Sequence, residues 1–316
     1  MAVVVAVRLP LLLPLLTNLF MPSLKEVKNR ISSVKSTQQI TRAMKMVAAS
    51  KLRRAQDRLL QMRPYAQKLN RILTNVSANL SEENTSLYAT ERETKNVLLV
   101  AFSSDRGLCG GFNSNVFRFS RQFITDEYET YERNERLYVM PVGQKSYEFY
   151  KKRGYQVVEG YQDLFSDRSF ENVRRAASLV MEAFEEGRFD KVIMIYNRFK
   201  NVATQEVTAE QLLPIQSNIE EQDTDASADT NIDYIYEPSE EFVVKELIPQ
   251  SLKIQFYQAY LESNAGEQGA RMTAMDKATD NAGELLKELK LTYNRTRQAA
   301  ITKEILEIVA GADALG

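Results

Sequence analysis

An apolar position recurs every three or four residues over the first quarter of the chain, beginning at Leu24 and ending at Leu80. Only Gln38, Thr41 and Lys45 interrupt it. A strict seven-residue repeat over about eight heptads predicts a helix that supercoils with another long helix, because the stripe of a lone helix would drift around its surface. The apolar seam consists of Leu24, Val27, Ile31, Val34, Ala48, Leu52, Ala55, Leu59, Met62, Ala66, Leu69, Leu73, Val76 and Leu80.

A second long helical segment is expected at the other end of the chain, over about residues 251–312, because no proline follows Pro249. Its apolar face carries Ile301, Ile305, Ile308, Val309 and Ala312. We expect this face to pack on the N-terminal seam, so that the two ends form one antiparallel coiled coil. Within the first helix, Pro64 predicts a kink or a break near Arg63.

Strand-length apolar runs alternate with amphipathic segments between these two helices. The expected strands are residues 95–103, 136–141, 155–159, 191–199 and 202–215, and the expected helices are residues 116–131, 145–152 and 172–185. Strands separated by helices favour right-handed crossovers and a doubly wound, mainly parallel sheet, with the last strand antiparallel at an edge. The predicted fold is therefore an α/β domain plus a long antiparallel coiled coil of the N- and C-terminal helices.

The expected division of the chain follows from this pattern. Residues 22–93 form the N-terminal coiled-coil helix, residues 94–237 the central α/β (Rossmann-like) domain, and residues 238–316 the C-terminal coiled-coil helix. Residues 1–21 are apolar at first but too short to span a bilayer, and they lack a clear signal or transit pattern. We interpret them as an extension ahead of a true start at Met21, with a signal or anchor as the alternative.

Composition argues against chemistry by this chain. It has no histidine, which removes the commonest general base and metal ligand, and one cysteine, Cys109, which excludes an intrachain disulfide and a cysteine zinc site. We therefore expect no catalytic residues, no cofactor and no metal. Residues 23–71 carry thirteen Lys or Arg against Glu26 and Asp57, while residues 216–246 carry ten acidic residues against Lys245. The basic helix indicates an acidic partner or nucleic acid.

A glycine loop, DRGLCGGFN at residues 105–113, follows the first expected strand and precedes a helix. Gly107, Gly110 and Gly111 could bring backbone amides to a phosphate. Their spacing matches neither the dinucleotide fingerprint nor the P-loop, which also needs a Lys-Ser/Thr pair. We therefore expect a tight structural turn, with a nucleotide-dependent enzyme as the weaker alternative.

Four motifs in order carry a family resemblance over residues 21–316. They are SVKSTQQITRAMKMVAASKLRRAQ at residues 33–56, SSDRGLCGGFN, DYIYEP at residues 233–238, and a C-terminal segment that begins EQGARMTAMDKATDN. The chain resembles the gamma subunit of the rotary, F-type proton-translocating ATP synthase of bacteria. The resemblance implies a non-catalytic rotor of the central stalk that couples proton flow through the c ring to conformational change at the beta-subunit catalytic sites.

The resemblance also implies partners and contacts. The partners are three alpha and three beta subunits, the epsilon subunit and the c-subunit ring, with no nucleic acid and no small-molecule substrate bound directly. The segment Ile308 to Leu315 would suit a bearing formed by the ring of alpha and beta subunits. Contacts to beta subunits are implied for Met44, Lys45, Arg271, Gln298 and Thr302, and contacts of the foot with the c ring and epsilon for Tyr234, Tyr236 and Glu237.

Each implied contact has a plainer interpretation. Lys45 could simply interrupt the coiled coil or extend to solvent, Arg271 could be an ordinary exposed helix charge, and the tyrosines could pack at a sheet edge. The plastid form of the family carries a cysteine pair as a redox switch, whereas Cys109 is alone here. This favours a bacterial enzyme, peripheral on the cytoplasmic side of the plasma (inner) membrane. The alternative function is a basic coiled-coil nucleic-acid-binding protein.

Overall fold

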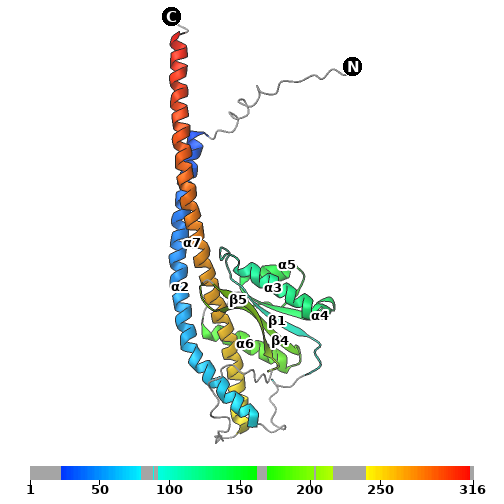
Figure 1. The fold of residues 1–316 in the computed structure, drawn as a ribbon. Helices are drawn as coiled ribbons and strands as arrows, with labels where there is room; N and C mark the ends of the chain where they lie inside the picture. Colours follow the sequence, from blue (N-terminus) through cyan, green and yellow to red (C-terminus); the bar gives the residue numbers. More distant parts are fainter. Residues whose placement is uncertain are drawn as a thin grey trace, which may run out of the picture. The chain divides into compact units, whose positions relative to one another are not determined.

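A computed structural model describes residues 23–79, 88, 92–161, 169–202, 204–215 and 240–313. The chain forms two compact units, one of residues 1–44 with 275–316 and one of residues 45–274. Two long helices, α2 and α7, run through both units (Figure 1). The helices are α2 (Leu24–Asn79), α3 (Phe112–Glu127), α4 (Glu129–Arg133), α5 (Gln144–Lys152), α6 (Phe170–Glu185) and α7 (Glu240–Asp313). The strands are β1 (Val97–Phe102), β2 (Leu137–Val142), β3 (Gln156–Val157), β4 (Lys191–Phe199) and β5 (Gln205–Leu213).

The predicted seam is the buried stripe of α2. Every seam position between residues 24 and 69 is buried or half-buried, and Ala48 is 1% exposed. Nearly all the positions between them are exposed. α2 continues through Pro64 as one helix, so the predicted break is absent. α7 likewise contains Pro249 and begins eleven residues before the expected start at residue 251.

The unit formed by residues 1–44 and 275–316 contains an antiparallel helix pair. Gln38 Nε2 donates to the Thr279 carbonyl at 3.4 Å, and the hydroxyls of Thr41 and Thr279 are 2.8 Å apart. Toward the start of α2, Val27 lines a shared cavity with Leu289 of α7. Residue numbers rise along α2 as they fall along the adjoining part of α7, which confirms the antiparallel pairing. Two of the polar interruptions of the seam are thus hydrogen-bonded to the partner helix.

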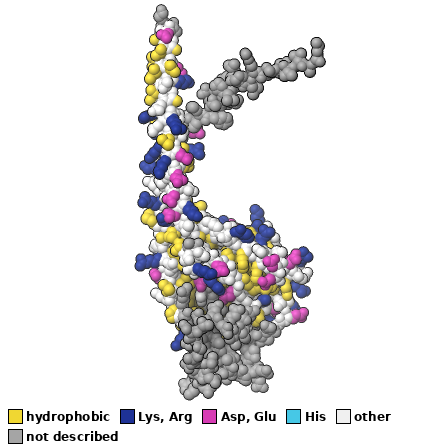
Figure 2. Space-filling view, in the orientation of Figure 1, with side chains coloured by type: hydrophobic (Ala, Val, Ile, Leu, Met, Phe, Trp, Pro, Cys, Tyr) yellow, Lys and Arg dark blue, Asp and Glu magenta, His cyan; other side chains and the backbone are white. Residues whose placement is uncertain are grey.

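The predicted packing of the C-terminal apolar face is wrong. α2 begins at Leu24, and its first turns lie beside Leu285, Leu289 and Thr292. α7 continues to Asp313, and among the described residues no other helix covers its terminal apolar side chains. The exposed side chains are Ile301, Ile305, Leu306, Ile308 and Val309, with exposed fractions of 49 to 72%. They form an apolar strip at the end of α7 (Figure 2).

The unit formed by residues 45–274 contains a five-stranded sheet of order β3-β2-β1-β4-β5. Strands β1 to β4 pair in parallel, with Val97 aligned to both Leu137 and Lys191. β5 pairs antiparallel with β4 at the edge, as the sequence predicts. The crossovers run through helices, so the doubly wound, mainly parallel sheet is confirmed.

Helices cover both faces of this sheet (Figure 1). Leu98, Val100 and Phe102 of β1 face a core shared with α6, α7 and α2. The alternate residues of β1 face a core shared with α3 and α5. α7 crosses one end of the sheet closely at Gly266, where an added Cβ would lie 3.4 Å from Asn197 Cβ. Small residues on α7 therefore allow the long helix to contact the α/β domain directly.

Candidate partner-contact surfaces

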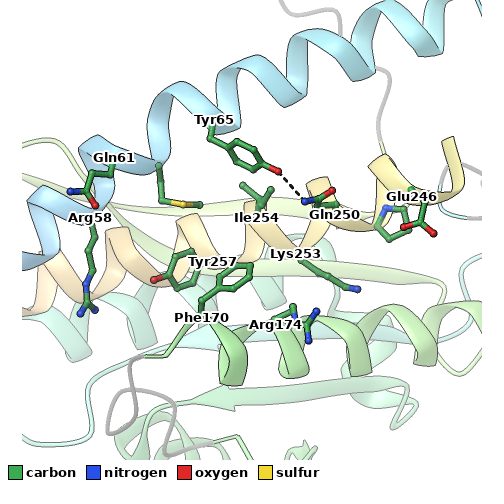
Figure 3. Close-up of a pocket in the computed structure, with 12 residues that line it drawn as sticks. Arg58, Gln61, Tyr65, Phe170, Arg174, Glu246, Gln250, Lys253, Ile254 and Tyr257 are labelled. Carbon is green, nitrogen blue, oxygen red and sulfur yellow. Dashed lines mark hydrogen bonds between the residues drawn. The ribbon is translucent and has the colours of Figure 1, made fainter. Parts of the chain in front are cut away.

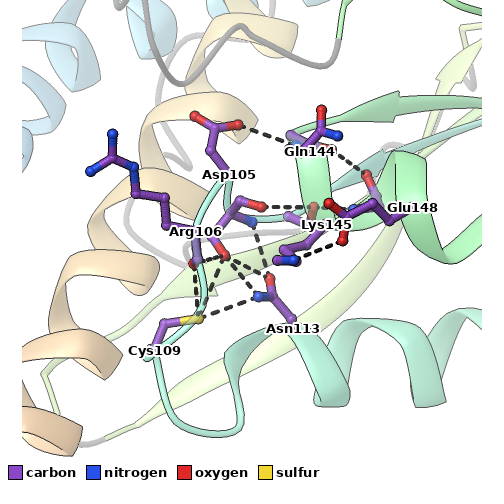
Figure 4. A network of polar contacts seen from close by, with 11 residues as sticks. Asp105, Arg106, Cys109, Asn113, Gln144, Lys145 and Glu148 are labelled. Carbon is purple, nitrogen blue, oxygen red and sulfur yellow. Dashed lines mark hydrogen bonds and ion pairs between the residues drawn. The ribbon is translucent and has the colours of Figure 1, made fainter.

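The glycine loop is held by its own polar groups (Figure 4). The Ser104 amide donates to Asn113 Oδ1 at 3.0 Å, and the Ser104 hydroxyl donates to the Arg106 carbonyl at 2.8 Å. Asn113 Nδ2 lies 3.3 Å from the buried Cys109 Sγ. Because these side chains close the turn internally, the loop is the structural element that its spacing predicts, and the geometry gives no support to a phosphate cradle.

The start of α5 fixes the other side of this loop. The Gln144 amide donates to Asp105 Oδ1 at 3.2 Å, and the Lys145 amide donates to the Ser104 carbonyl at 3.1 Å. The Lys145 ammonium lies 2.7 Å from a Glu148 carboxylate oxygen and holds the pKa of Glu148 below its usual range. The loop and the N-terminus of α5 therefore form one polar network at the carboxyl end of β1.

Arg271 connects this loop to α7. Its guanidinium pairs with the Glu267 carboxylate one turn earlier, and it donates to the carbonyls of Arg106 at 3.0 Å and Gly107 at 3.2 Å. The side chains of Arg271 and Glu267 are 13% and 5% exposed. Arg271 is therefore no ordinary exposed charge, since most of its donors are used within the chain. Its implied contact to a beta subunit stays a prediction.

The remaining predicted contact residues lie at separate places on the long helices. Met44 and Lys45 are half-buried neighbours on α2, and Lys45 occupies the seam position that the heptad count assigned to it. Gln298 and Thr302 are exposed on the part of α7 that extends past the start of α2. Tyr234, Tyr236 and Glu237 lie outside the described residues, as does the acidic run at residues 217–231.

Sequence reasoning missed a buried polar stretch on α7. Residues 262–268 are buried along their whole length, and Glu262 meets the polar side chains of β4 and β5 there. Burial raises the pKa of Glu262, and a hydrogen bond from Gln258 Nε2 at 3.2 Å opposes that shift only in part. The run ESNAGEQG, polar and small residues within a long helix, was the available signal.

The described residues hold no group of three or more His, Cys, Asp or Glu placed to bind a metal ion. Within the same residues, no helix combines the length and apolarity needed to cross a bilayer. The prominent features of the described residues are a long helix pair, an exposed apolar helix end and a hydrogen-bonded loop beside α7. Together they define a protein of the helix-pair plus α/β class, whose candidate sites are surfaces for other proteins.

Comparison with known proteins places the chain within this class. The ATP synthase family matches residues 23–315. The chain belongs to the gamma chains of that family, the central-stalk subunits of F-type ATP synthases, as the motif resemblance predicts. It is 56% identical over 295 residues to the ATP synthase gamma chain of Cytophaga hutchinsonii, covering 93% of this chain and 99% of that one. It is 48% identical over 300 residues to that of Chloroherpeton thalassium, with the same coverage.

Solved structures show the same architecture. A chain of the Tetrahymena thermophila mitochondrial ATP synthase central stalk and c ring has a TM-score of 0.52 and 26% identity, covering 76% of this chain and 99% of that one. A chain of the Euglena gracilis mitochondrial ATP synthase, in rotational state 3, has a TM-score of 0.60 and 20% identity, covering 92% and 94%. At 20% identity, the similarity to the Euglena gracilis chain is evidence of a shared fold alone.

Proposed function

We propose that this chain is the rotor of a bacterial F-type ATP synthase, coupling proton flow through a c-subunit ring to conformational change at the beta-subunit catalytic sites. It performs no chemistry itself and takes no cofactor or small-molecule substrate into a catalytic site. The observation that carries the proposal is the exposed end of α7, where a long apolar strip projects past α2. Exposed apolar strips of this kind are typical of surfaces that another protein covers.

The physical requirement for such a rotor is asymmetry. A shaft biases the conformations of its neighbours only through contacts that differ between those conformations. The pair of α2 and α7 meets this requirement because its two helices carry unlike surfaces, with basic residues concentrated in α2. Figure 2 shows basic and acidic side chains interspersed along the helix pair below an apolar end. Each rotational position would therefore present different chemistry to a given beta subunit.

The proposed partners are three alpha and three beta subunits around the helices, with epsilon and the c ring at the foot. Met44, Lys45, Gln298 and Thr302 are the proposed direct contacts to beta subunits. Arg271 is proposed to act at the same interface, and its hydrogen bonds to the glycine loop support a role in presenting that loop as well. The residues at 234, 236 and 237 are the proposed contacts of the foot.

The proposed location is the cytoplasmic side of the bacterial inner membrane, where the chain is peripheral and held by its partners. The relatives from bacteria support this placement. The charge of the chain does not argue for binding to nucleic acid, because acidic and basic side chains are interspersed along the helix pair (Figure 2).

The rotor function can be tested by placing a proline in the seam of α2. Ala48 is 1% exposed, so Ala48→Pro would remove a helix hydrogen bond and disturb the packing of α2 on α7, at about 3 kcal/mol or more. Ala48→Ser is the matched control, because it keeps the helix intact. In reconstituted vesicles we expect the proline variant to hydrolyse ATP without pumping protons, while the serine variant pumps normally. A proline variant that assembles and pumps like the wild type would contradict the rotor mechanism.

A further inference from the structure

A cavity of about 730 Å³ lies between α2, the start of α6 and α7, within the unit of residues 45–274. Figure 3 shows Tyr65 of α2, Phe170 of α6 and Tyr257 of α7 grouped around it, with Arg58 at one side and Lys253 at the other. The volume is in the range of pockets that hold small organic ligands. None of the predicted contact residues that the structure describes lines this cavity.

The floor of the cavity is apolar and aromatic. Ile254 and Tyr257 are buried, and Met62 of α2 lies beside them. Phe170, the first residue of α6, is 43% exposed and packs edge-on against Tyr257 with ring centroids 5.0 Å apart. A large aromatic side chain left this exposed at a cavity wall offers a face for a flat or aliphatic group.

The rim of the cavity is positively charged. Arg58, Arg174 and Lys253 line it, against Glu246 as the acidic residue. Arg174 pairs with Glu171 at 2.7 Å. Among the described residues, Arg58 and Lys253 have no carboxylate within ion-pair distance. These two cations lie on different helices, α2 and α7, on opposite sides of Phe170 and Tyr257 (Figure 3). An anionic group beside Lys253 would pair with a cation that the described residues leave without a carboxylate partner.

We propose that this cavity binds an amphipathic anion, meaning one carboxylate, sulfonate or phosphate group on a flat aromatic or short aliphatic body. The apolar body lies on Phe170 and Tyr257, and the anionic group lies beside Lys253 at one end of the cavity (Figure 3). A ligand seated there would contact α2, α6 and α7 at once and stabilise their packing by binding the folded state alone. The described residues assigned to the rotor function lie outside this cavity, and ligand binding is measured on the chain alone, so the two proposals can fail independently.

The test uses the full-length chain and two fluorescent probes that share an aromatic body. One is 1-anilinonaphthalene-8-sulfonate, an anion, and the other is N-phenyl-1-naphthylamine, which is neutral. We expect the anion to bind with 1:1 stoichiometry and more tightly than the neutral probe. Lys253→Gln should weaken binding of the anionic probe by about 3- to 10-fold, because it removes one charge-assisted contact. It should leave binding of the neutral probe unchanged. Phe170→Ala should weaken both.

Lys287→Gln is the matched control, because Lys287 is an exposed lysine of α7 outside the cavity. It should change neither affinity. Circular dichroism melts identify any variant that fails to fold, and Lys253→Met provides a second variant in that event. Equal affinity for both probes, or equal effects of the Lys253 and Lys287 variants on the anionic probe, would overturn the proposal.

Discussion

Removing one partner of the ion pair between Arg271 and Glu267 should be among the most destabilising single substitutions in the α/β unit. Both side chains are nearly buried, at 13% and 5% exposed. Arg271→Met would leave the Glu267 carboxylate buried and unpaired, which costs about 3–5 kcal/mol. It would also remove the hydrogen bonds that Arg271 donates to the carbonyls of Arg106 and Gly107, and the loss of each bond costs about 1 kcal/mol. Glu267 keeps the hydrogen bond that Gln268 Nε2 donates to its Oε2 at 2.9 Å, so we expect a net loss of about 3–5 kcal/mol.

The assay is urea unfolding followed by tyrosine fluorescence, which is available because the chain has 15 tyrosines and no tryptophan. Arg133→Met is the matched control, since Arg133 and Glu129 form an i,i+4 pair that is 74% and 49% exposed. That pair should contribute at most about 1 kcal/mol. In the double variant Glu267→Gln/Arg271→Met, the loss should be smaller than for Arg271→Met alone, because no carboxylate is left unpaired. Equal losses for Arg271→Met and Arg133→Met, or strictly additive effects, would refute the reasoning.

Three further outcomes are expected. Gly143→Ala should lower the free energy of unfolding by more than about 3 kcal/mol, because φ at Gly143 is +103° and the added Cβ would lie 2.2 Å from a backbone carbonyl oxygen. Gly107→Ala should be nearly neutral in the same urea unfolding assay, because an added Cβ there would have nothing within 4 Å. Burial raises the pKa of Glu262, so the contribution of Glu262 to stability is present below the ordinary carboxyl pKa and is lost as the pH rises through the raised pKa. Glu262→Gln should therefore stabilise the protein more at pH 8 than at pH 5. A difference in unfolding free energy between variant and wild type that does not change with pH would contradict this. The double variant Ile305→Gln/Ile308→Gln should leave the thermal melting curve unchanged and lower self-association measured by light scattering, because both residues are exposed. A large loss of stability would mean that the apolar strip is packed against another part of the chain.

The heptad count predicted the α2 stripe position by position, because a coiled-coil seam is a local property of one helix. The same argument failed for Ile301 to Val309. An apolar face on a helix shows that something should cover it but not whether the cover belongs to the same chain. Whether α2 covers this face of α7 depends on the residue at which α2 begins. The periodicity of α7 gives no information about where α2 begins.

The alternation of strands and helices predicted the parallel sheet and its antiparallel edge strand, since crossover rules leave few topologies. The role of Arg271 could not be predicted in this way. Its partners at residues 106 and 107 are more than 160 positions away in the chain, and a backbone carbonyl leaves no signature in sequence. The buried polar stretch around Glu262 was missed for a related reason, because its burial depends on the sheet and α2 enclosing α7 together.

The most direct measurement is co-expression of this chain, started at Met21, with the alpha and beta subunits of the same organism. Size exclusion with quantified subunit stoichiometry and an ATPase assay then follow, with and without this chain. The account predicts a stable complex with one copy per three alpha–beta pairs, and turnover that depends on the chain. A chain that elutes alone and leaves turnover unchanged would contradict the rotor function.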